Sequence, residues 1–222
     1  MNLLKSIDYF DPDAVKDRIH IIGCGSVGST LAEHLARYGL SNFVLYDFDV
    51  VEDKNIVNQM FDLRDVGRPK VDAVADKLKS INADVKVRTV KTGWNEDMTL
   101  SGYVFLCVDS IAVRKAVVEA NKYNSLIKGM FDFRTGLVEA DHFACAWQSA
   151  NEIKWLLSTM NFTDEEAEAH NPVTACGITI GVAATVRLIV DVGVCNFIQN
   201  VKGNGLKKMI TVNTETINVF AQ

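Results

Sequence analysis

Arg18-Ile-His-Ile-Ile-Gly23-Cys-Gly25-Ser-Val-Gly28 is the stretch that decides the fold of this chain. Its first residues form a short apolar run typical of a buried strand, and the segment from Ser29 to Tyr38 carries apolar side chains at helical spacing. Gly39 predicts the end of that helix, because glycine readily adopts the left-handed conformation of a helix C-cap. A second apolar run from Asn42 to Asp47 completes a βαβ unit, and the right-handed crossover of such units predicts a parallel sheet.

The rest of the chain continues this alternation. We expect helices over residues 70–81 and 111–124, and strands over residues 85–90, 102–108, 126–133 and 137–148. The composition then becomes acidic and less apolar, and we expect a mobile excursion over about residues 151–172. We expect a long helix over residues 174–200 and a closing hairpin made of strands 208–213 and 216–220.

These elements predict an α/β fold with a Rossmann-like, mostly parallel sheet flanked by helices and additional antiparallel strands toward the C-terminus. Because no linker divides the chain, we expect a single domain over residues 1–222. Its nucleotide-binding half covers about residues 15–125, and residues 126–222 add the sheet extension, the excursion, the closing helix and the hairpin.

The composition excludes several classes of protein. Hydrophobic residues make up 48% of the 222 residues, charged residues 23%, and only three residues are prolines, which excludes a disordered or collagen-like chain. The net charge is −5, from 23 Lys and Arg against 28 Asp and Glu, so nucleic acid is an unexpected main partner. The apolar stretch from Val173 to Val186 is shorter than the roughly 20 residues that span a bilayer, so no membrane partner is expected.

The cysteines and histidines predict neither a disulfide framework nor a protein-held transition metal. The five cysteines contain no C-x-x-C pair, and the first residues lack the apolar core of a signal peptide, so we expect a cytoplasmic protein. Cys176, at the expected start of the long helix, is the one cysteine whose setting could lower a thiol pKa, whereas a packing role beside Gly177 is favoured. No ligand spacing relates the histidines His20, His34, His142 and His170.

The residues Gly23-Cys-Gly25-Ser-Val-Gly28 fit the pattern G-x-G-x-x-G between a strand and a helix. Bare glycines let the backbone approach a phosphate, and the amides of a helix N-terminus stabilise its charge, so a nucleotide is implied. Asp47 is the acidic residue expected about 20 residues later, where a carboxylate can accept both ribose hydroxyl protons. This pattern alone leaves a dinucleotide, ATP and an unliganded turn as alternatives.

Two further charged residues favour a triphosphate. Lys70 begins a predicted helix close to the glycine loop, where an ammonium suits phosphate charge, although a solvated residue in the first turn is the alternative. Asp109 ends a predicted parallel strand, where ligands bind in open α/β sheets, and it could hold Mg²⁺ against phosphates. The alternative for Asp109 is that it caps the following helix.

The ordered set G-x-G-x-x-G, D-x-D-x-V, N-x-x-x-Q, D-V-G-x-P-K, I-N and C-x-D-S-x-x-x-R resembles the ThiF/MoeB/HesA superfamily, the adenylating domain related to ubiquitin-activating enzymes. The resemblance runs from Ile19 to about Arg114 and is weaker between Gly177 and Val190. It implies an ATP-dependent adenylyltransferase that uses Mg²⁺ and transfers AMP to a carboxylate. The usual partner is the C-terminal glycine of a ubiquitin-like or sulfur-carrier protein.

The resemblance also implies roles for individual residues. The loop residues Gly23, Gly25, Ser26 and Gly28 would cradle the nucleotide, with Asp47 and Asp49 beside them on the ribose side. Catalytic roles fall on Lys70 at the phosphates, on Asn55 and Gln59 beside the triphosphate, and on Asp109, which would bind the metal. Arg114 would be structural.

The chain departs from the family pattern in three ways. Asn58 stands before Gln59, where the family usually has an arginine for the γ-phosphate, and Arg64 or Arg68 could replace that charge. Paired C-x-x-C zinc motifs are absent. A catalytic-cysteine domain and a C-terminal ubiquitin-fold or rhodanese domain are also absent, so we expect activation without a stable covalent enzyme adduct.

Three alternatives to this activity remain. They are a non-catalytic ThiF-like binding scaffold, an NAD-dependent oxidoreductase, and an enzyme that adenylates a small molecule or a modified tRNA base. The family resemblance further implies a homodimer, for which Gly177, Gly181 and Ala184 would offer a face of small residues suited to close packing.

Overall fold

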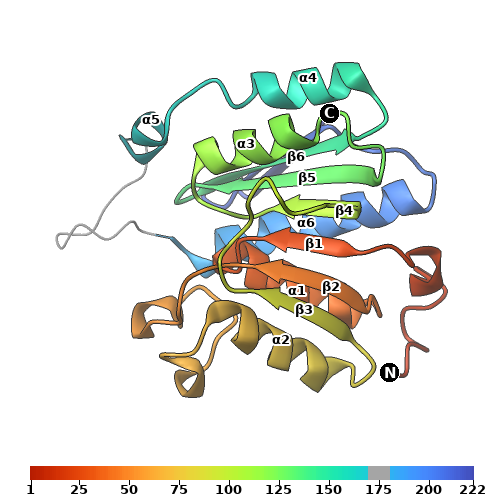
Figure 1. Ribbon diagram of the computed structural model, residues 1–222, viewed down its shortest axis with the longest axis vertical. Helices are drawn as coiled ribbons and strands as arrows, with labels where there is room; N and C mark the ends of the chain where they lie inside the picture. Colours follow the sequence, from red (N-terminus) through yellow and green to blue (C-terminus); the bar gives the residue numbers. More distant parts are fainter. Residues whose placement is uncertain (170–180) are drawn as a thin grey trace.

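The computed structural model describes residues 1–169 and 181–222 and contains one eight-stranded mixed sheet in the order β3-β2-β1-β4-β5-β6-β7-β8 (Figure 1). The first five strands along the chain run parallel: β1 Ile19–Ile22, β2 Asn42–Tyr46, β3 Lys86–Val90, β4 Gly102–Leu106 and β5 Ile127–Thr135. Three antiparallel strands follow: β6 Glu139–Ala146, β7 Met209–Asn213 and β8 Asn218–Ala221. The predicted fold class is therefore confirmed.

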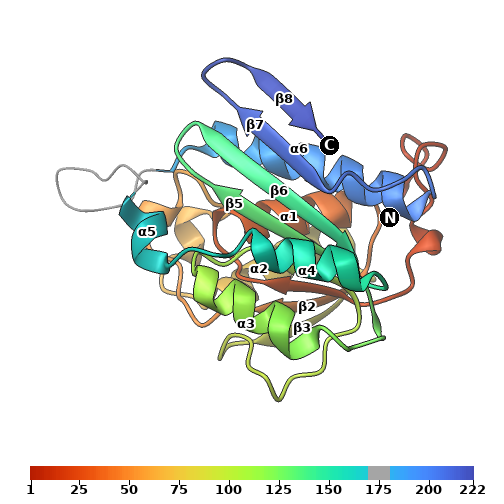
Figure 2. The same cartoon turned by 90° about the horizontal axis from the view of Figure 1, so that it is seen from above.

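Helices cover both faces of this sheet (Figure 2). One face carries α1 Ser26–Arg37, α2 Lys70–Ile81 and α6 Ala183–Val201, and the other carries α3 Ile111–Asn121 and α4 Ala150–Ser158. Three short 3₁₀ helices lie in loops: Pro12–Ala14, Asp53–Asn55 and Leu63–Asp65. All residues of β1 and β4 are buried because helices cover both faces, and this burial explains why the two strands read as nearly continuous apolar runs.

The predicted excursion over residues 151–172 is wrong for its described part, which folds into α4 and a short helix, α5 Asp164–Ala169. Ser149 caps α4 by accepting a hydrogen bond from the Glu152 amide. Ile153 and Leu156 are buried against the sheet. Burial of these apolar side chains therefore stabilises α4. The acidic residues that follow α4 in the sequence made this helix hard to predict.

The predicted helix over 174–200 begins later than expected, because α6 starts at Ala183 with Val182 as its N-cap. Residues 170–180, and with them Cys176, Gly177 and His170, lie outside the described part of the chain. Gly181 precedes the helix, so it does not share a helical face with Ala184 as the proposed dimer surface required. Among the described residues, no helix is long and apolar enough to cross a membrane.

Two buried histidines lie on strands in different halves of the sheet. His20 on β1 and His142 on β6 are 1% and 0% exposed. Burial, which penalises the charged imidazolium, lowers the pKa of each from 6.5 to about 4. His142 packs against the ring of Phe133, with 4.4 Å between the ring centroids.

We predict that the protein loses stability as the pH falls from 6.5 toward 4. In this window the unfolded histidines are protonated and the folded ones are neutral, so the unfolded state binds more protons and the free energy of unfolding decreases. The expected loss is about 2 to 3 kcal/mol for each histidine by pH 4.5. Urea denaturation at pH 7 and pH 4.5 measures it, and His142→Asn should remove about half of the pH dependence. An unchanged pH dependence in that variant would contradict the assignment.

Candidate active site

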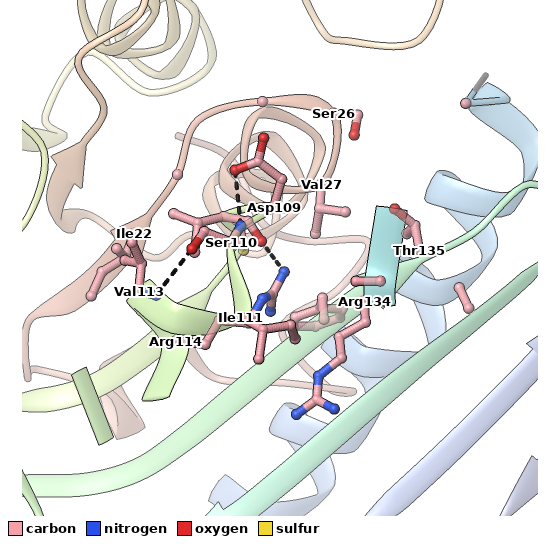
Figure 3. A pocket seen from close by; sticks show the side chains of 18 of the residues that line it. Ile22, Ser26, Val27, Asp109, Ser110, Ile111, Val113, Arg114, Arg134 and Thr135 are labelled. Atoms are coloured by element: carbon pink, nitrogen blue, oxygen red, sulfur yellow. Dashed lines mark hydrogen bonds between the residues drawn. The ribbon is translucent and has the colours of Figure 1, made fainter. Parts of the chain in front are cut away.

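A cavity of about 1450 Å³ lies beyond the carboxyl ends of β1, β2 and β4. From β1 the chain continues to β2 on one side of the sheet and later to β4 on the other, which opens a crevice where loops diverge. Figure 3 shows Asp109 and Ser110 at the start of α3, with Arg134 and Thr135 of β5 in the same cavity. The carboxyl end of the parallel strands, where the sequence places Asp109, is thus where the structure has this cavity.

The three glycines of the loop have different physical roles. Gly23 has a φ of +93°, and a Cβ there would lie 2.7 Å from the Cys107 carbonyl. A Cβ on Gly28 would lie only 1.9 Å from the Gly23 carbonyl oxygen, so Gly28 permits the contact between α1 and the loop after β1. Gly25 has open space around it and lines the cavity, as do Gly23 and Ser26, but Gly28 does not. The prediction that Gly28 touches the nucleotide is therefore replaced by a packing role.

The first turn of α1 faces this cavity with free backbone amides. Gly25 is its N-cap and supplies no side-chain hydrogen bond. The first amides of any helix have no partner within the helix, so those here remain available to an anion. The helix begins at Ser26, three residues before the start that its apolar pattern predicts, because glycine and serine in the first turn carry no periodic signal.

Asp47, Asp49 and Lys70 form the second wall of the cavity. The Asp47 carboxylate accepts hydrogen bonds from the amides of Cys24 at 2.6 Å and of Asp49 at 2.8 Å, so it fixes the glycine loop. Burial raises the pKa of Asp47 above its ordinary value, against the effect of those hydrogen bonds. Both aspartates lie where the sequence predicts them.

Lys70 is a buried cation of the site. It begins α2, its residue is 7% exposed, and its Nζ lies 2.7 Å from Oδ2 of Asp49, which is half exposed. The alternative of a solvated lysine in the first helical turn is therefore wrong. The Lys70 ammonium lies at the cavity wall, and its carboxylate partner Asp49 is accessible to water. Lys70 can therefore attract the negative charge of a ligand that enters the cavity.

Asn55, Asn58 and Gln59 follow β2 in a loop, and only two of them reach the cavity. The Asn55 side chain is buried and accepts from the Glu52 amide at 2.8 Å in a capping box, so its predicted place beside the phosphates is wrong. Asn58 donates to the Gly181 carbonyl at 3.1 Å. The Gln59 side-chain oxygen is buried without a hydrogen-bond partner among the described residues, a deficit that a ligand donor could satisfy.

Asp109 points into the cavity and does not cap α3. The N-cap is Ser110, whose Oγ accepts from the Val113 amide at 3.1 Å. Asp164 of α5 adds a second cap, since its carboxylate accepts from the Ile111 amide at 2.5 Å and the Ser110 hydroxyl at 2.9 Å. Asp109 is left exposed and accepts one hydrogen bond, from the Ser110 amide at 2.9 Å.

Asp109 is the residue that would hold a magnesium ion beside a bound phosphate group, and its chemistry fits that ion. Magnesium keeps hard oxygen ligands and is usually held by one or two carboxylates together with substrate phosphates. The structure places the exposed Asp109 carboxylate in the same cavity as the amides of α1. Within the described residues, no group of three or more His, Cys, Asp and Glu side chains is arranged to hold a metal ion.

A buried ion-pair network supports the floor of the cavity. Arg114 of α3 is 4% exposed, contacts the fully buried Asp132 of β5, and donates to the Leu106 and Val108 carbonyls. Asp132 also accepts from Arg134 at 2.8 Å. The structural role predicted for Arg114 is confirmed, because this side chain joins α3 to the ends of β4 and β5.

Comparison with known proteins identifies the family. The family model described as "ThiF family" matches residues 12–204. The chain belongs to the ThiF family. Two of its similar relatives are a ubiquitin-like modifier-activating enzyme 5 of Aedes aegypti and the molybdopterin-synthase adenylyltransferase of Escherichia coli strain K12. The first is 34% identical over 45% of this chain and 29% of that protein, and the second 31% identical over 61% of this chain and 54% of that protein.

Solved structures share the fold of this ThiF-family protein at lower identity. The crystal structure of SeMet PaaA has a TM-score of 0.73 at 16% identity, over 95% of this chain and 65% of that chain. The structure titled E. coli MccB + ATP has a TM-score of 0.68 at 19% identity over the same shares. This chain thus spans between about a third and a half of the curated relatives described above, and about two thirds of the solved ones.

Asn58 stands where the family usually has an arginine, and neither Arg64 nor Arg68 brings a replacement charge into the cavity. Arg64 pairs with Asp62, Arg68 pairs with Asp65, and neither arginine lines the cavity. Arg134 does line it, and sequence reasoning missed this residue. Its guanidinium also donates to the Thr159 carbonyl at 2.7 Å, which ties β5 to the end of α4. The one signal in the sequence was the presence of Asp132 and Arg134 at the end of the apolar run of β5.

Three of the described cysteines, Cys24, Cys107 and Cys145, are buried and fit packing roles. Burial raises the pKa of the thiols of Cys24, Cys107 and Cys145, the last to about 12. Each of these thiols stays protonated at neutral pH and is a poor nucleophile. Cys195 is exposed on α6, away from the residues that line the cavity.

The two glycines give a matched pair of variants. Gly25→Ala should be destabilised less than Gly28→Ala, because its Cβ meets nothing within 4 Å, but it should weaken ATP binding by obstructing the approach of phosphate. Gly28→Ala should lower the free energy of unfolding by about 1 to 3 kcal/mol, because its Cβ overlaps the Gly23 carbonyl. Urea denaturation and calorimetric titration with ATP separate the two effects. Equal destabilisation by both variants would contradict the division of roles.

Proposed function

We propose that this ThiF-family protein is an ATP-dependent adenylyltransferase that activates the C-terminal carboxylate of a ubiquitin-like or sulfur-carrier protein as an acyl adenylate. One observation carries the proposal: the bare Gly25 loop, the buried Lys70 ammonium and the exposed Asp109 carboxylate line a single cavity. Each suits one part of a nucleoside triphosphate with its magnesium ion. The names of the curated relatives, an activating enzyme and an adenylyltransferase, agree with it.

The chemistry asks little of the protein beyond alignment and charge. An oxygen of the acceptor carboxylate forms a bond to the α-phosphorus of ATP, the bond from that phosphorus to the bridging oxygen breaks, and pyrophosphate leaves with its electron pair. An ionised carboxylate needs no general base. Lys70 and the first amides of α1 offset the charge that accumulates on the phosphates, and such preorganised groups are a major source of rate enhancement.

Each remaining residue of the site orients a part of the nucleotide in this proposal. Asp47 accepts hydrogen bonds from the ribose hydroxyls of the nucleotide, and its hydrogen bonds to the amides of Cys24 and Asp49 fix its orientation. Gln59 presents an unpartnered oxygen to the ligand, and Asp109 would hold magnesium, which supplies charge neutralisation when bound. Arg114 positions Asp109 and its loop through the carbonyls of Leu106 and Val108.

The cavity has room for a second reactant. Its volume of about 1450 Å³ exceeds the roughly 300 to 1,000 Å³ of ordinary small-molecule pockets. It continues from the nucleotide residues along Arg134, Thr135 and Leu137 toward β6. An extended C-terminal tail entering from that side would bring its carboxylate toward the phosphates.

One alternative function has an observation in its favour. Asn58 brings no charge to the cavity and donates to the Gly181 carbonyl, so a scaffold that binds nucleotide without turnover fits this one residue. An NAD-dependent oxidoreductase would leave the buried Lys70 and the exposed Asp109 without a role. We further propose a homodimer and a cytoplasmic location, which sedimentation and fractionation would test.

Lys70→Gln should weaken binding of ATP and Mg²⁺ by about tenfold or more, since a buried charge-assisted contact is lost. Lys79→Gln is the matched control on the same helix, because Lys79 is exposed and distant from the cavity. Calorimetric titration measures both variants without any acceptor protein. If Lys70→Gln binds ATP like the unaltered protein, the proposal is wrong.

Catalysis has its own measurement, the exchange of labelled pyrophosphate into ATP in the presence of a ubiquitin-like or sulfur-carrier protein that ends in glycine. Asp109→Asn should reduce the exchange rate about a hundredfold or more, because the metal and its charge are lost from the transition state. Tight ATP binding without exchange by any such carrier would favour the scaffold. Preference for NAD over ATP would favour the oxidoreductase.

A further inference from the structure

A second cavity of about 340 Å³ runs along β2 from its first residue, Asn42, to its last, Tyr46. Asn42 and Lys86, which line it, are the first residues of β2 and β3, whereas the nucleotide site follows the last residues of the strands. His20, Val44 and Arg88 are paired across β1, β2 and β3, so their side chains lie on one face of the sheet. This face is the one that α3 and α4 cover farther along.

The floor of this cavity holds a hydroxyl whose proton has no acceptor. The Ser101 amide donates to Nε2 of His20 at 3.3 Å, and His20 is neutral at pH 7, so its proton is on Nδ1. Nδ1 therefore donates to the Tyr46 hydroxyl at 2.8 Å. The O–H of Tyr46 must then point elsewhere, and no described residue accepts it, although Tyr46 is only 4% exposed.

The walls of the cavity carry three cations without carboxylate partners. Arg18, Lys86 and Arg88 line it, and none forms an ion pair with any described residue, whereas five of the eight arginines of the chain do. Arg18 and Arg88 line the cavity together with His20, and after burial their positive charges are the next causes that lower the pKa of His20. No carboxylate lines the cavity.

From this convergence we infer that the cavity formed by Arg18, Lys86, Arg88 and the Tyr46 hydroxyl binds a small multivalent oxyanion, phosphate or pyrophosphate. Every charged group at the site is a donor, and so is the oriented O–H, so a suitable ligand must be an acceptor on several sides. Guanidinium forks match the spacing of phosphate oxygens, and the lysine adds a point charge. The volume limits the occupant to a small anion or the end of a larger one.

Calorimetric titrations with inorganic phosphate and with pyrophosphate test this inference separately. We expect saturable binding of at least one of them that weakens as salt rises. Arg18→Gln and Arg88→Gln should each weaken it by about tenfold, and Tyr46→Phe by several-fold, because it removes only the hydroxyl donor. Arg187→Gln is the matched control, since Arg187 is exposed on α6 over the other face of the sheet and also has no described ion pair.

Lys70→Gln separates this cavity from the nucleotide site, because it should leave phosphate or pyrophosphate binding intact while ATP binding weakens. The inference is wrong if neither anion binds, if Arg187→Gln weakens binding as much as Arg88→Gln, or if binding disappears only in Lys70→Gln. Arg18 and Arg88 are exposed, so their variants should remain folded, and circular dichroism checks this. ATP binding by Arg88→Gln should be unchanged, so failure here and failure of the proposed adenylyltransferase are distinguishable.

Discussion

The close approach of α1 to the end of β1 is the constraint on which the rest of the structure depends. It exists because Gly28 has no side chain, so that the helix can pass directly over the Gly23 carbonyl. The contact fixes where the first turn of α1 lies, and with it the direction of its free amides. It also sets the position of α1 along its packing contacts with α2 and α6. The same contact therefore orients the loop amides and places α1 in the hydrophobic core.

Part of the buried charge in this protein lies in or beside the larger cavity, whereas Glu33 and Asp65 are buried elsewhere. Lys70, Arg114 and Asp132 are each less than a tenth exposed, and each would be costly to bury alone. Their partners differ in a useful way. Arg114 and Arg134 share Asp132 inside the protein, which stabilises a fixed floor, whereas Lys70 pairs with a half-exposed Asp49 and keeps its charge near an entering ligand.

The two cavities are neighbours along β2, and they share one lining residue. Tyr46, the last residue of β2, lines both, with its hydroxyl held by His20 on the side of the cationic cavity. Asp47 follows it directly and binds the glycine loop. The hydroxyl that faces the cationic cavity and the carboxylate that binds the glycine loop therefore belong to adjacent residues, Tyr46 and Asp47.

The sequence by itself determined the βαβ unit, the end of the sheet at which the larger cavity lies, and the glycine loop, Asp47, Lys70 and Asp109 in its wall. Apolar periodicity and glycine spacing are local, and the carboxyl ends of neighbouring parallel strands must meet, so Asp47, Lys70 and Asp109 were bound to converge. Only the tertiary structure decided the roles of Asn55, which is a capping residue, and of Arg134, which reaches the cavity from β5. It alone also brought Arg18, Lys86 and Arg88 together. These side chains come from separate segments, and their proximity depends on strand order and register, which no short-range pattern encodes.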